Sequence, residues 1–326
     1  MSIRIIFFGT PEFAAASLDM LIKNGYDIAA VVTAPDKPAG RGLEIKMSAV
    51  KEYAREKNLK IMQPENLKSE EFIVQLKELH PDLGVVAAFR KMPKEVFSLP
   101  KYGTFNLHAS LLPQYRGAAP VNWAIINGEK ESGVTTFFLD EEIDTGKVIL
   151  RAKENIREED TAGDLYERLM KDGADLVLKT VRAIETGNYT PEDQSSFIKP
   201  SEKLKPAPKI FKDDCKINWK KKAEDVYDFI RGLSPHPAAW TEITSPPSLP
   251  ERKGELISLK IFNSKKEIIQ HGHESGAINT DGKTFLKIAV KDGFINITDL
   301  QLAGKKRMDV QEFLRGFSFH SWKINF

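Results

Sequence analysis

The chain contains one cysteine, Cys215, in 326 residues, which excludes a disulfide framework and any cysteine-based metal cluster. Two histidines, His271 and His273, form the sequence HGH without further ligands nearby, so we expect a solvated turn and no metal site. No apolar run approaches the roughly 20 residues that span a bilayer. The N-terminus has only a short apolar run, which is not typical of a signal peptide. We therefore expect a cytoplasmic protein with no membrane partner.

Two signatures of phosphate binding are missing as well. The sequence FFGTPEF follows the first expected strand but lacks the pattern G-x-G-x-x-G of dinucleotide-binding sites. The pattern G-x-x-x-x-G-K-[ST] does not occur either. A dehydrogenase with a dinucleotide cofactor is therefore not supported.

The net charge of the chain is small, +2, but it is unevenly distributed. Residues 1–200 contain 26 Lys and Arg against 30 Asp and Glu, whereas residues 201–326 contain 22 against 16. The first part is therefore acidic and the second basic, which hints at a polyanionic partner for the second part. A solvated, lysine-rich surface would give the same totals.

Strand-like and helix-like segments alternate over the first two hundred residues, beginning with RIIFFG and PEFAAASLDMLIKNG. This alternation predicts an α/β domain with a mainly parallel sheet. Residues 189–209 are rich in proline and lysine and lack periodicity, so we expect a linker there. Short strands separated by Gly, Asp and Asn turns follow, as in a small antiparallel barrel or sandwich. The expected domains are therefore residues 1–188 and 210–326.

The segment NLHASLLPQYRGAAP, residues 106–120, begins like a strand but carries polar side chains on one face. Asn106 and His108 are two residues apart, so they point the same way. Ligands of an open parallel sheet bind outside the carboxyl ends of its strands. The next expected strand, GVTTFFLD, leads into the acidic turn EEIDTG, which contains Asp144. If these strands are near neighbours, a carboxylate of this turn can reach the His108 imidazole.

An amide, an imidazole and a carboxylate have complementary roles in a carbonyl reaction. The imidazole can move a proton near neutral pH, the carboxylate can orient it, and the amide can stabilise a developing oxyanion. No serine, cysteine or lysine is obviously placed as a covalent nucleophile. Direct attack of a substrate amine on a carbonyl therefore suits the set. A buried structural histidine beside a turn-capping asparagine is the alternative that the pattern leaves open.

A second candidate site is the loop APDKPAGRG, residues 34–42, which carries Lys37 and Arg41. Mobile loops that present cations after a strand can clamp a phosphate or an RNA end. An ordinary surface loop is the alternative.

Together these motifs resemble those of the folate-dependent formyltransferases. The sequence NLHASLLPQYRGAAP, completed by DTG at residues 144–146, is similar to the signature of that family. FFGTPEFA, TAPDKPAGRG, QPENL, INW from Ile217 and LQLAGKKRM are similar to the members that formylate tRNA. The resemblance covers nearly the whole chain. It implies a Rossmann-like formyltransferase domain followed by a small OB-like β-barrel domain.

The resemblance also implies a reaction and a site. The formyl donor would be 10-formyltetrahydrofolate, and the acceptor would be the α-amino group of methionine on initiator tRNA. The residues that match the catalytic positions of the family are Asn106, His108 and Asp144. The residues that match its folate-contacting turn are Ser110, Leu111, Leu112 and Pro113. The loop with Lys37 and Arg41 matches the segment that engages the acceptor end of the tRNA.

The basic second part gains a meaning from the same resemblance, because OB-like folds bind nucleic acid and phosphates are contacted mainly by lysine and arginine. We expect tRNA contacts from Lys203, Lys205, Lys209 and residues 220–222. A monomer is expected, because no heptad pattern or exposed apolar stripe stands out.

Two rival functions remain at this point. One is a formyltransferase for an amino-sugar nucleotide, which would work without RNA. The other is a non-enzymatic RNA-binding protein on the same fold, against which the intact Asn106, His108 and Asp144 argue. The chain also departs from the family pattern beside the expected folate site, with Phe89-Arg90 in place of Tyr-Gly and Glu142 in place of a glycine.

Overall fold

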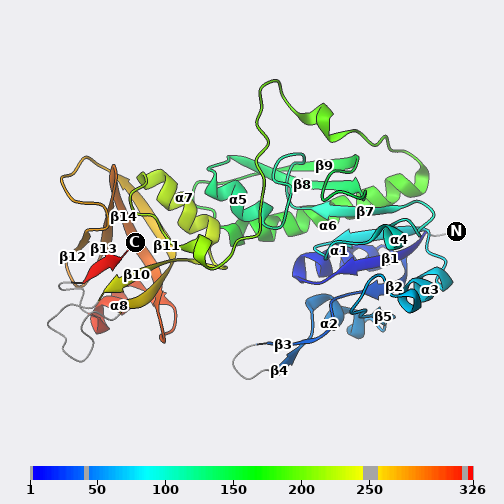
Figure 1. The fold of residues 1–326 in the computed structure, drawn as a ribbon, viewed down its shortest axis with the longest axis horizontal. Coiled ribbons are helices and arrows are strands. Elements are labelled where there is room, and N and C mark those ends of the chain that lie inside the picture. The colour runs from blue at the N-terminus through cyan, green and yellow to red at the C-terminus, as the bar shows by residue number, and fades with distance from the viewer. Residues whose placement is uncertain (1–2, 40–43, 245–255, 318–321, 326) are drawn as a thin grey trace. The chain divides into compact units, whose positions relative to one another are not determined.

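The computed structural model in Figure 1 describes residues 3–39, 44–244, 256–317 and 322–325. The chain divides into two compact units, of which the first consists of Met1–Gly117, Glu131–Asn155 and Glu167–Ala207. The second consists of Ala118–Lys130, Ile156–Tyr166 and Pro208–Phe326. Two short segments between residues 118 and 166 therefore belong with the C-terminal residues. The domain boundaries expected from the sequence stay a prediction.

The first unit is built on a seven-stranded sheet with the order β5-β2-β1-β6-β7-β8-β9. Its strands are β1 Arg4–Gly9, β2 Asp27–Val32, β5 Ile61–Met62, β6 Leu83–Ala87, β7 Thr104–His108, β8 Glu131–Phe138 and β9 Val148–Asn155. The strands from β5 to β7 run parallel, and β8 and β9 are antiparallel additions at one edge. The predicted mainly parallel α/β fold is confirmed.

Helices cover both faces of this sheet. They are α1 Glu12–Lys23, α2 Ala49–Glu56, α3 Glu70–Glu78, α4 Lys94–Phe97 and α6 Ala162–Thr186. On one face, Ile6 and Phe8 of β1 share a core cluster with Phe72 of α3. Gly173 of α6 comes so close to β7 that a Cβ atom there would lie 2.8 Å from the Leu107 side chain. Because neighbouring side chains on a strand alternate, the residues on either side of Leu107 face away from α6.

Local capping interactions fix the starts of two of these helices. Ser48 precedes α2, and its hydroxyl accepts a hydrogen bond from the Lys51 backbone N–H at 3.1 Å. At the start of α6, the Asp164 N–H donates to the Thr161 hydroxyl at 3.2 Å. The Thr161 N–H in turn donates to the Asp164 carboxylate at 2.8 Å, which completes the capping box.

Residues 189–207, called the connector below, are fastened to the first unit at several points. Val148 and Glu192 exchange backbone hydrogen bonds of 2.8 and 2.9 Å. Farther along, the Ala207 N–H donates to the Arg116 carbonyl at 2.8 Å. Between these points lies a short 3₁₀ helix, η1 Gln194–Phe197. A segment whose composition suggests only a linker is therefore a bound part of the first unit.

The second unit is an antiparallel, nearly barrel-shaped sheet with the order β12-β13-β14-β11-β10-β16, and β15 pairs with β14. Its strands are β10 Ala239–Thr244, β11 Leu256–Ile268, β12 Ile278–Thr280, β13 Leu286–Val290, β14 Gly293–Leu302, β15 Met308–Asp309 and β16 Lys323–Asn325. Its helices are α5 Pro120–Ile126, η2 Asp213–Cys215, α7 Ala223–Leu233 and α8 Val310–Gly316. The predicted small barrel is thereby confirmed.

The core of the second unit lies between α7 and the sheet. Val226 and Ile230 of α7 belong to one buried cluster with Leu259 of β11. Trp219, from the INW motif, is fully buried in the same cluster, and its indole N–H donates to the Thr241 hydroxyl at 3.1 Å. Among the described residues, no helix combines the length and apolar character that a bilayer crossing requires.

Candidate active site

The carboxyl end of β7 presents Asn106 and His108 on one side of the sheet. Val86 of β6 is the register partner of Asn106, and Thr135 of β8 is that of His108. The Asn106 side chain is half-buried and has no hydrogen-bond partner among the residues that the structure describes. His108 is buried, with 6% of its surface exposed. His108 is therefore buried in the fold, whereas Asn106 keeps an amide that is free of hydrogen bonds within the described residues.

The His108 ring is held by one specific acceptor. Its Nε2 atom lies 2.8 Å from the Tyr115 carbonyl oxygen. A carbonyl only accepts hydrogen bonds, so Nε2 carries the proton and Nδ1 is the basic nitrogen of the neutral ring. Nδ1 lies 3.9 Å from Asp144 Oδ2, which is too long for a direct hydrogen bond. Both atoms therefore remain available to a third polar atom.

Asp144 is positioned by the turn after β8. Its backbone is left-handed, with φ of +57°, and its Oδ2 accepts a hydrogen bond from the Gly117 N–H at 3.0 Å. Gly146 must be a glycine, because a Cβ atom there would lie 1.8 Å from the Phe138 carbonyl oxygen. The expected meeting of a carboxylate from this turn with His108 is thus present in the structure.

The other acidic residues of the turn have separate tasks. Asp140 accepts two contacts from the Thr145 hydroxyl, at 2.7 and 2.9 Å. Glu141 pairs with Lys94 at 2.5 Å, and this hydrogen bond lowers the pKa of Glu141 and raises that of Lys94. Glu142, which replaces the glycine expected from the resemblance, is exposed. Of the four carboxylates of the turn, all of them in the described part of the chain, only Asp144 forms an ion-pair contact with His108.

The segment expected to contact folate is a tight turn built around the cis peptide bond Leu112–Pro113. Thr135 of β8 braces it, because its hydroxyl donates to the Ser110 carbonyl at 2.7 Å and accepts from the Leu112 N–H at 3.1 Å. The Ser110 hydroxyl is already bound to the Gln114 carbonyl at 2.6 Å. Ser110, Leu112 and Pro113 are buried and Leu111 is half-buried. Such a turn would meet a ligand chiefly through its backbone.

Arg90, which replaces the glycine expected from the resemblance, is bound to a neighbouring loop. Its Nη1 donates to the Glu65 carbonyl at 2.8 Å, and its Nη2 donates to the Pro64 carbonyl. The guanidinium also lies over the Phe89 ring, 5.8 Å from its centroid. The departure at Phe89-Arg90 therefore joins β6 to the QPENL segment.

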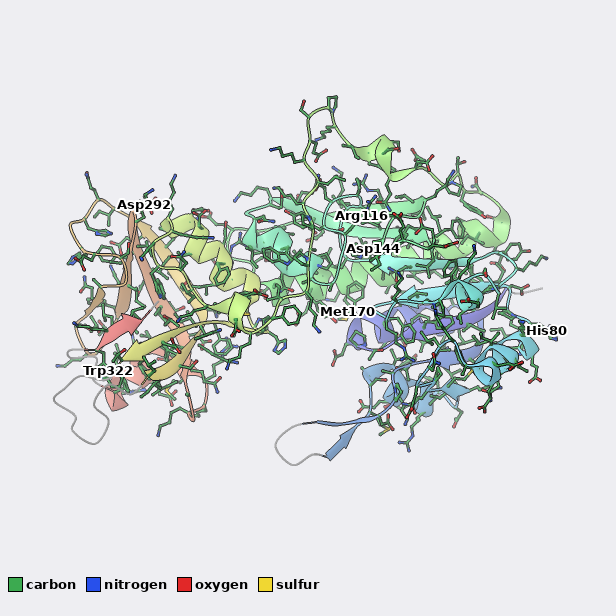
Figure 2. All side chains as sticks on the ribbon, in the orientation of Figure 1. His80, Arg116, Asp144, Met170, Asp292 and Trp322 are labelled. Carbon is green, nitrogen blue, oxygen red and sulfur yellow. The ribbon has the colours of Figure 1, made fainter. Side chains whose placement is uncertain are left out.

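Arg116 and Gln194 complete the surroundings of Asp144, and the sequence patterns do not indicate Gln194. Arg116 and Asp144 are both labelled in Figure 2. Arg116 donates from Nε and Nη2 to Gln194 Oε1 of η1, at 3.0 and 2.7 Å. Gln194 Nε2 donates to the carbonyls of Asp144 and Gly146, both at 2.9 Å. Nothing in the polar stretch PEDQSS distinguishes this glutamine, whose importance follows only from its burial.

The residues expected to contact tRNA lie in different parts of the chain. Lys37 is on β3 Lys37–Ala39, which pairs with β4 Glu44–Lys46, and Arg41 lies outside the described residues. Lys203 and Lys205 are exposed on the connector.

Lys209 and its neighbours belong to the second unit. Lys209 is exposed, and its ammonium lies 5.3 Å from the centroid of the Phe211 ring. Residues 220–222 are also exposed, immediately before α7. Within the described ranges, no group of three or more His, Cys, Asp or Glu side chains is arranged to hold a metal ion.

Comparison with known proteins gives two family matches. Residues 1–181 match the family described as formyl transferase, and residues 209–318 match the formyl transferase C-terminal domain. Among solved structures, the sugar 3N-formyl transferase WlaRD, crystallised in the presence of dTDP and 5-N-formyl-THF, aligns with a TM-score of 0.63 at 23% identity. That alignment covers 94% of this chain and all of WlaRD, and it shows the shared fold.

Relatives found by sequence comparison are more similar to this chain than that structure is. The methionyl-tRNA formyltransferase of Bacteroides thetaiotaomicron is 51% identical over 324 residues, which are 99% of this chain and 98% of that protein. The methionyl-tRNA formyltransferase of Phocaeicola vulgatus is 52% identical over 316 residues, 97% of this chain and 96% of that protein. The chain belongs to the formyl transferase family and, within it, to the methionyl-tRNA formyltransferases.

Proposed function

We propose that this chain transfers a formyl group from 10-formyltetrahydrofolate to the α-amino group of methionine on initiator methionyl-tRNA. The observation that carries the proposal is the contact of His108 Nδ1 with Asp144 Oδ2 at 3.9 Å, beside the Asn106 amide, which has no hydrogen-bond partner within the described residues. In the reaction, a bond forms between the amine nitrogen and the formyl carbon, and the bond from that carbon to N10 of the folate breaks. The amine loses a proton and N10 gains one.

His108 suits the proton transfer. The Tyr115 carbonyl holds the proton on Nε2, so Nδ1 has a lone pair that can take the proton of the attacking amine. The resulting imidazolium is stabilised by the Asp144 carboxylate. The same proton can then pass to the leaving nitrogen, so the ring returns to its starting state.

Asn106 suits the charge that develops on the formyl oxygen. An amide N–H₂ that is not already bonded can donate to an oxyanion without first giving up another partner. Removal of one such donor should lower the rate roughly 10²- to 10³-fold.

The folate donor is supported by the family and by the WlaRD structure, which was obtained with a formylated tetrahydrofolate present. The braced turn of Ser110, Leu111, Leu112 and Pro113 would contact it through the backbone. The residues of this turn need no metal for that purpose.

The tRNA partner is supported by lysine ammonium groups that lie over aromatic rings in the second unit. Lys209 lies over Phe211, a ring that is 61% exposed. Lys212 lies 6.0 Å from the centroid of Trp240. A cation held on an aromatic face keeps its charge near the surface, and such surfaces favour nucleic acid. We infer that Lys203, Lys205 and Lys209 contact phosphates, together with Lys37 and Arg41 of the 34–42 loop.

A formyl-transfer assay tests the reaction. The protein should formylate charged initiator tRNA in the presence of 10-formyltetrahydrofolate and should leave free methionine unchanged. Asn106→Ala and His108→Ala should abolish most of the activity, whereas the exposed controls Asn279→Ala and His273→Ala should keep it. If a folded, folate-binding wild type leaves the tRNA unmodified, the proposal is wrong. Transfer to an amino-sugar nucleotide without RNA would then favour the rival acceptor.

Salt dependence tests the lysines. Charge reversal of Lys203, Lys205 and Lys209 should reduce the slope of log affinity against log salt by about 0.7 to 0.9 for each phosphate that the protein no longer neutralises. Reversal of the exposed Lys60 is the control and should leave the slope unchanged. An unchanged slope in the triple variant would remove these residues from the interface. We also propose that the protein is a monomer in the cytoplasm. Sedimentation of the free protein gives its mass and thereby tests whether it is a monomer.

A further inference from the structure

Gln194 is a polar side chain that the proposed reaction does not yet use. It is 4% exposed and begins the 3₁₀ helix η1. Its Oε1 accepts two hydrogen bonds from Arg116, and its Nε2 donates one each to the carbonyls of Asp144 and Gly146. A glutamine amide has two donor hydrogens and two acceptor lone pairs. All four are filled, so the orientation of the amide is fixed.

The connector holds Gln194 in place independently of its side chain. Two residues before it, Glu192 is bound to Val148 of β9 through both of its backbone groups. Farther along, the Lys205 carbonyl accepts from the Tyr115 N–H at 2.7 Å. Ala207 closes over Gly117, where a Cβ atom would lie 2.4 Å from the Ala207 carbonyl oxygen. The glutamine is therefore inserted from a strip of backbone that is anchored on both sides of it.

The contacts of Gln194 lead directly to Asp144. Asp144 has a left-handed backbone, which for a residue with a side chain has to be stabilised by its surroundings. The two carbonyls that accept hydrogen bonds from Gln194 belong to Asp144 and Gly146, on either side of Thr145. These two bonds therefore fix the backbone conformation of the turn. Arg116, at the other end of the amide, directly precedes Gly117, whose N–H binds the Asp144 carboxylate. One amide therefore joins the backbone of Asp144 to the loop that receives its side chain.

We propose that Gln194 is a positioning residue for formyl transfer, which sets the place of the Asp144 carboxylate opposite His108. This inference rests on the proposed function of the site. A neutral amide suits the task, because it fixes the turn through backbone carbonyls and adds no charge beside Asp144. A glutamate at this position would lose both donors and direct a second carboxylate at two carbonyl oxygens.

The first test is a comparison of two variants with similar volume. Gln194→Met removes the four hydrogen bonds near Asp144. Gln114→Met is the matched control, because the Gln114 side chain binds the same connector through Glu202, Lys203 and Lys205 but does not contact the Asp144 turn. Gln194→Met should lower kcat about 10²-fold with little change in KM, since a misplaced catalytic group costs about that much. Gln114→Met should lose melting temperature without a comparable loss of kcat.

A double-mutant cycle separates positioning from general stabilisation. If Gln194 acts through Asp144, the loss of kcat caused by Gln194→Met should largely disappear in an Asp144→Asn background. A residue that only stabilises the fold would give the same factor in both backgrounds. Equal factors, or a loss of kcat no larger than that of Gln114→Met, would overturn the proposal.

Hydrogen exchange provides a measurement that does not need activity. The Gly117 N–H reports the position of Asp144, because it is bonded to Oδ2 of that residue. Its exchange should become faster in Gln194→Met and stay slow in Gln114→Met. If the wild type does not formylate methionyl-tRNA, the proposed function fails, and the exchange rate still decides whether Gln194 fixes the turn. Unchanged exchange in Gln194→Met would overturn the inference whatever the acceptor is.

Discussion

Two buried polar clusters, one in each unit, use similar groups for different purposes. In the first unit, Arg116 and the Asp144 turn meet through the neutral amide of Gln194. In the second unit, Arg231 binds Asp228 directly, with 2.7 Å between Nε and Oδ1, and donates from Nη1 to the Asp160 carbonyl at 2.9 Å. The side chains of Asp228 and Arg231 are only 7% and 5% exposed.

The difference lies in what each cluster does to its carboxylate. Arg231 binds Asp228 through an ion pair and also donates to the Asp160 carbonyl, so that pair ties α7 to the segment 156–166. Gln194 leaves the charge of Asp144 intact, and the Asp144 carboxylate accepts from a neutral backbone donor, the Gly117 N–H. In the proposed reaction the Asp144 carboxylate responds to a proton on His108, and that role needs this second arrangement. The buried ion pair of Asp228 and Arg231 thus connects two segments of the second unit, whereas the neutral amide of Gln194 orients Asp144.

The same substitution in each cluster should give opposite results. Asp144→Asn keeps the shape and an acceptor for the Gly117 N–H but removes the charge opposite His108. We expect kcat to fall at least about 10²-fold, within the range of general acid–base contributions, with little change in melting temperature. Asp228→Asn should lower the melting temperature and leave kcat of the folded enzyme unchanged. Formyl-transfer rates and thermal unfolding of both variants test this difference between the two clusters. An equal loss of rate in both variants would contradict it.

Removal of the cation should affect stability most strongly in the second cluster. Arg231→Met leaves Asp228 buried without its partner, which should cost about 3 to 5 kcal/mol of unfolding free energy. The rate per folded molecule should not change. Denaturant unfolding followed by tryptophan fluorescence measures the loss, because Trp219 lies in the core of this unit. A second variant with both Arg231→Met and Asp228→Leu should recover most of the stability, since it leaves no unpaired charge.

The loss of unfolding free energy in Arg231→Met should depend on pH in a definite direction. Burial raises the pKa of Asp228 above its usual value, although the hydrogen bond from Arg231 opposes the shift. A carboxyl whose pKa is raised in the folded state favours folding at low pH and opposes it as the pH rises through the folded pKa. Without Arg231 the rise should be larger, so Arg231→Met should be more destabilising at pH 7 than at pH 5. A loss that does not vary over this range would contradict the assignment.

Much of this arrangement follows from the sequence because its signals are local. The alternation of strands and helices gives the parallel sheet, and Ser48, Thr161 and Asp164 mark helix starts. Asn106 and His108 are noticed because polar residues at spacing two are unusual at the end of a buried strand. Their meeting with Asp144 depends only on β7 and β8 being neighbours.

The rest depends on contacts that no local pattern encodes. The hydrogen bond between Gln194 and Arg116 joins residues 78 positions apart, and the polar composition of the connector suggests only a flexible linker. The sequence patterns do not reveal β9 and α5 either. β9 joins the sheet as an antiparallel edge strand after a turn full of charged residues. α5 is a short helix that packs against α7 of the second unit, to which the segment Ala118–Lys130 belongs.

A smaller change at Gly117 should disturb the site through the backbone. Gly117 has φ of +126°, and an added Cβ would lie 2.4 Å from the Ala207 carbonyl oxygen. Gly117→Ala should therefore cost about 1 to 3 kcal/mol of strain. Because the Gly117 N–H binds Asp144, kcat should fall as well. Gly187→Ala, at a glycine with positive φ and open space, is the control that strains the backbone away from the site. Normal kcat in Gly117→Ala would show that Asp144 has another support.

The smallest expected effect lies in the turn between β12 and β13. Hydrogen bonds from the Thr284 hydroxyl, and from the backbone N–H groups of Thr284 and Lys283 at 2.7 and 2.9 Å, hold the pKa of Asp281 well below its usual range. A lowered carboxyl pKa contributes stability above the unfolded value of about 3.9 and loses it as the pH falls toward the folded value. Asp281→Asn should therefore lower the melting temperature slightly at pH 7, and the difference from wild type should shrink below about pH 4. Thr284→Val removes only the hydroxyl donor and should show a weaker form of the same trend. A difference that stays constant from pH 7 to pH 3 would mean that the turn is stabilised by its shape and not by the charge of Asp281.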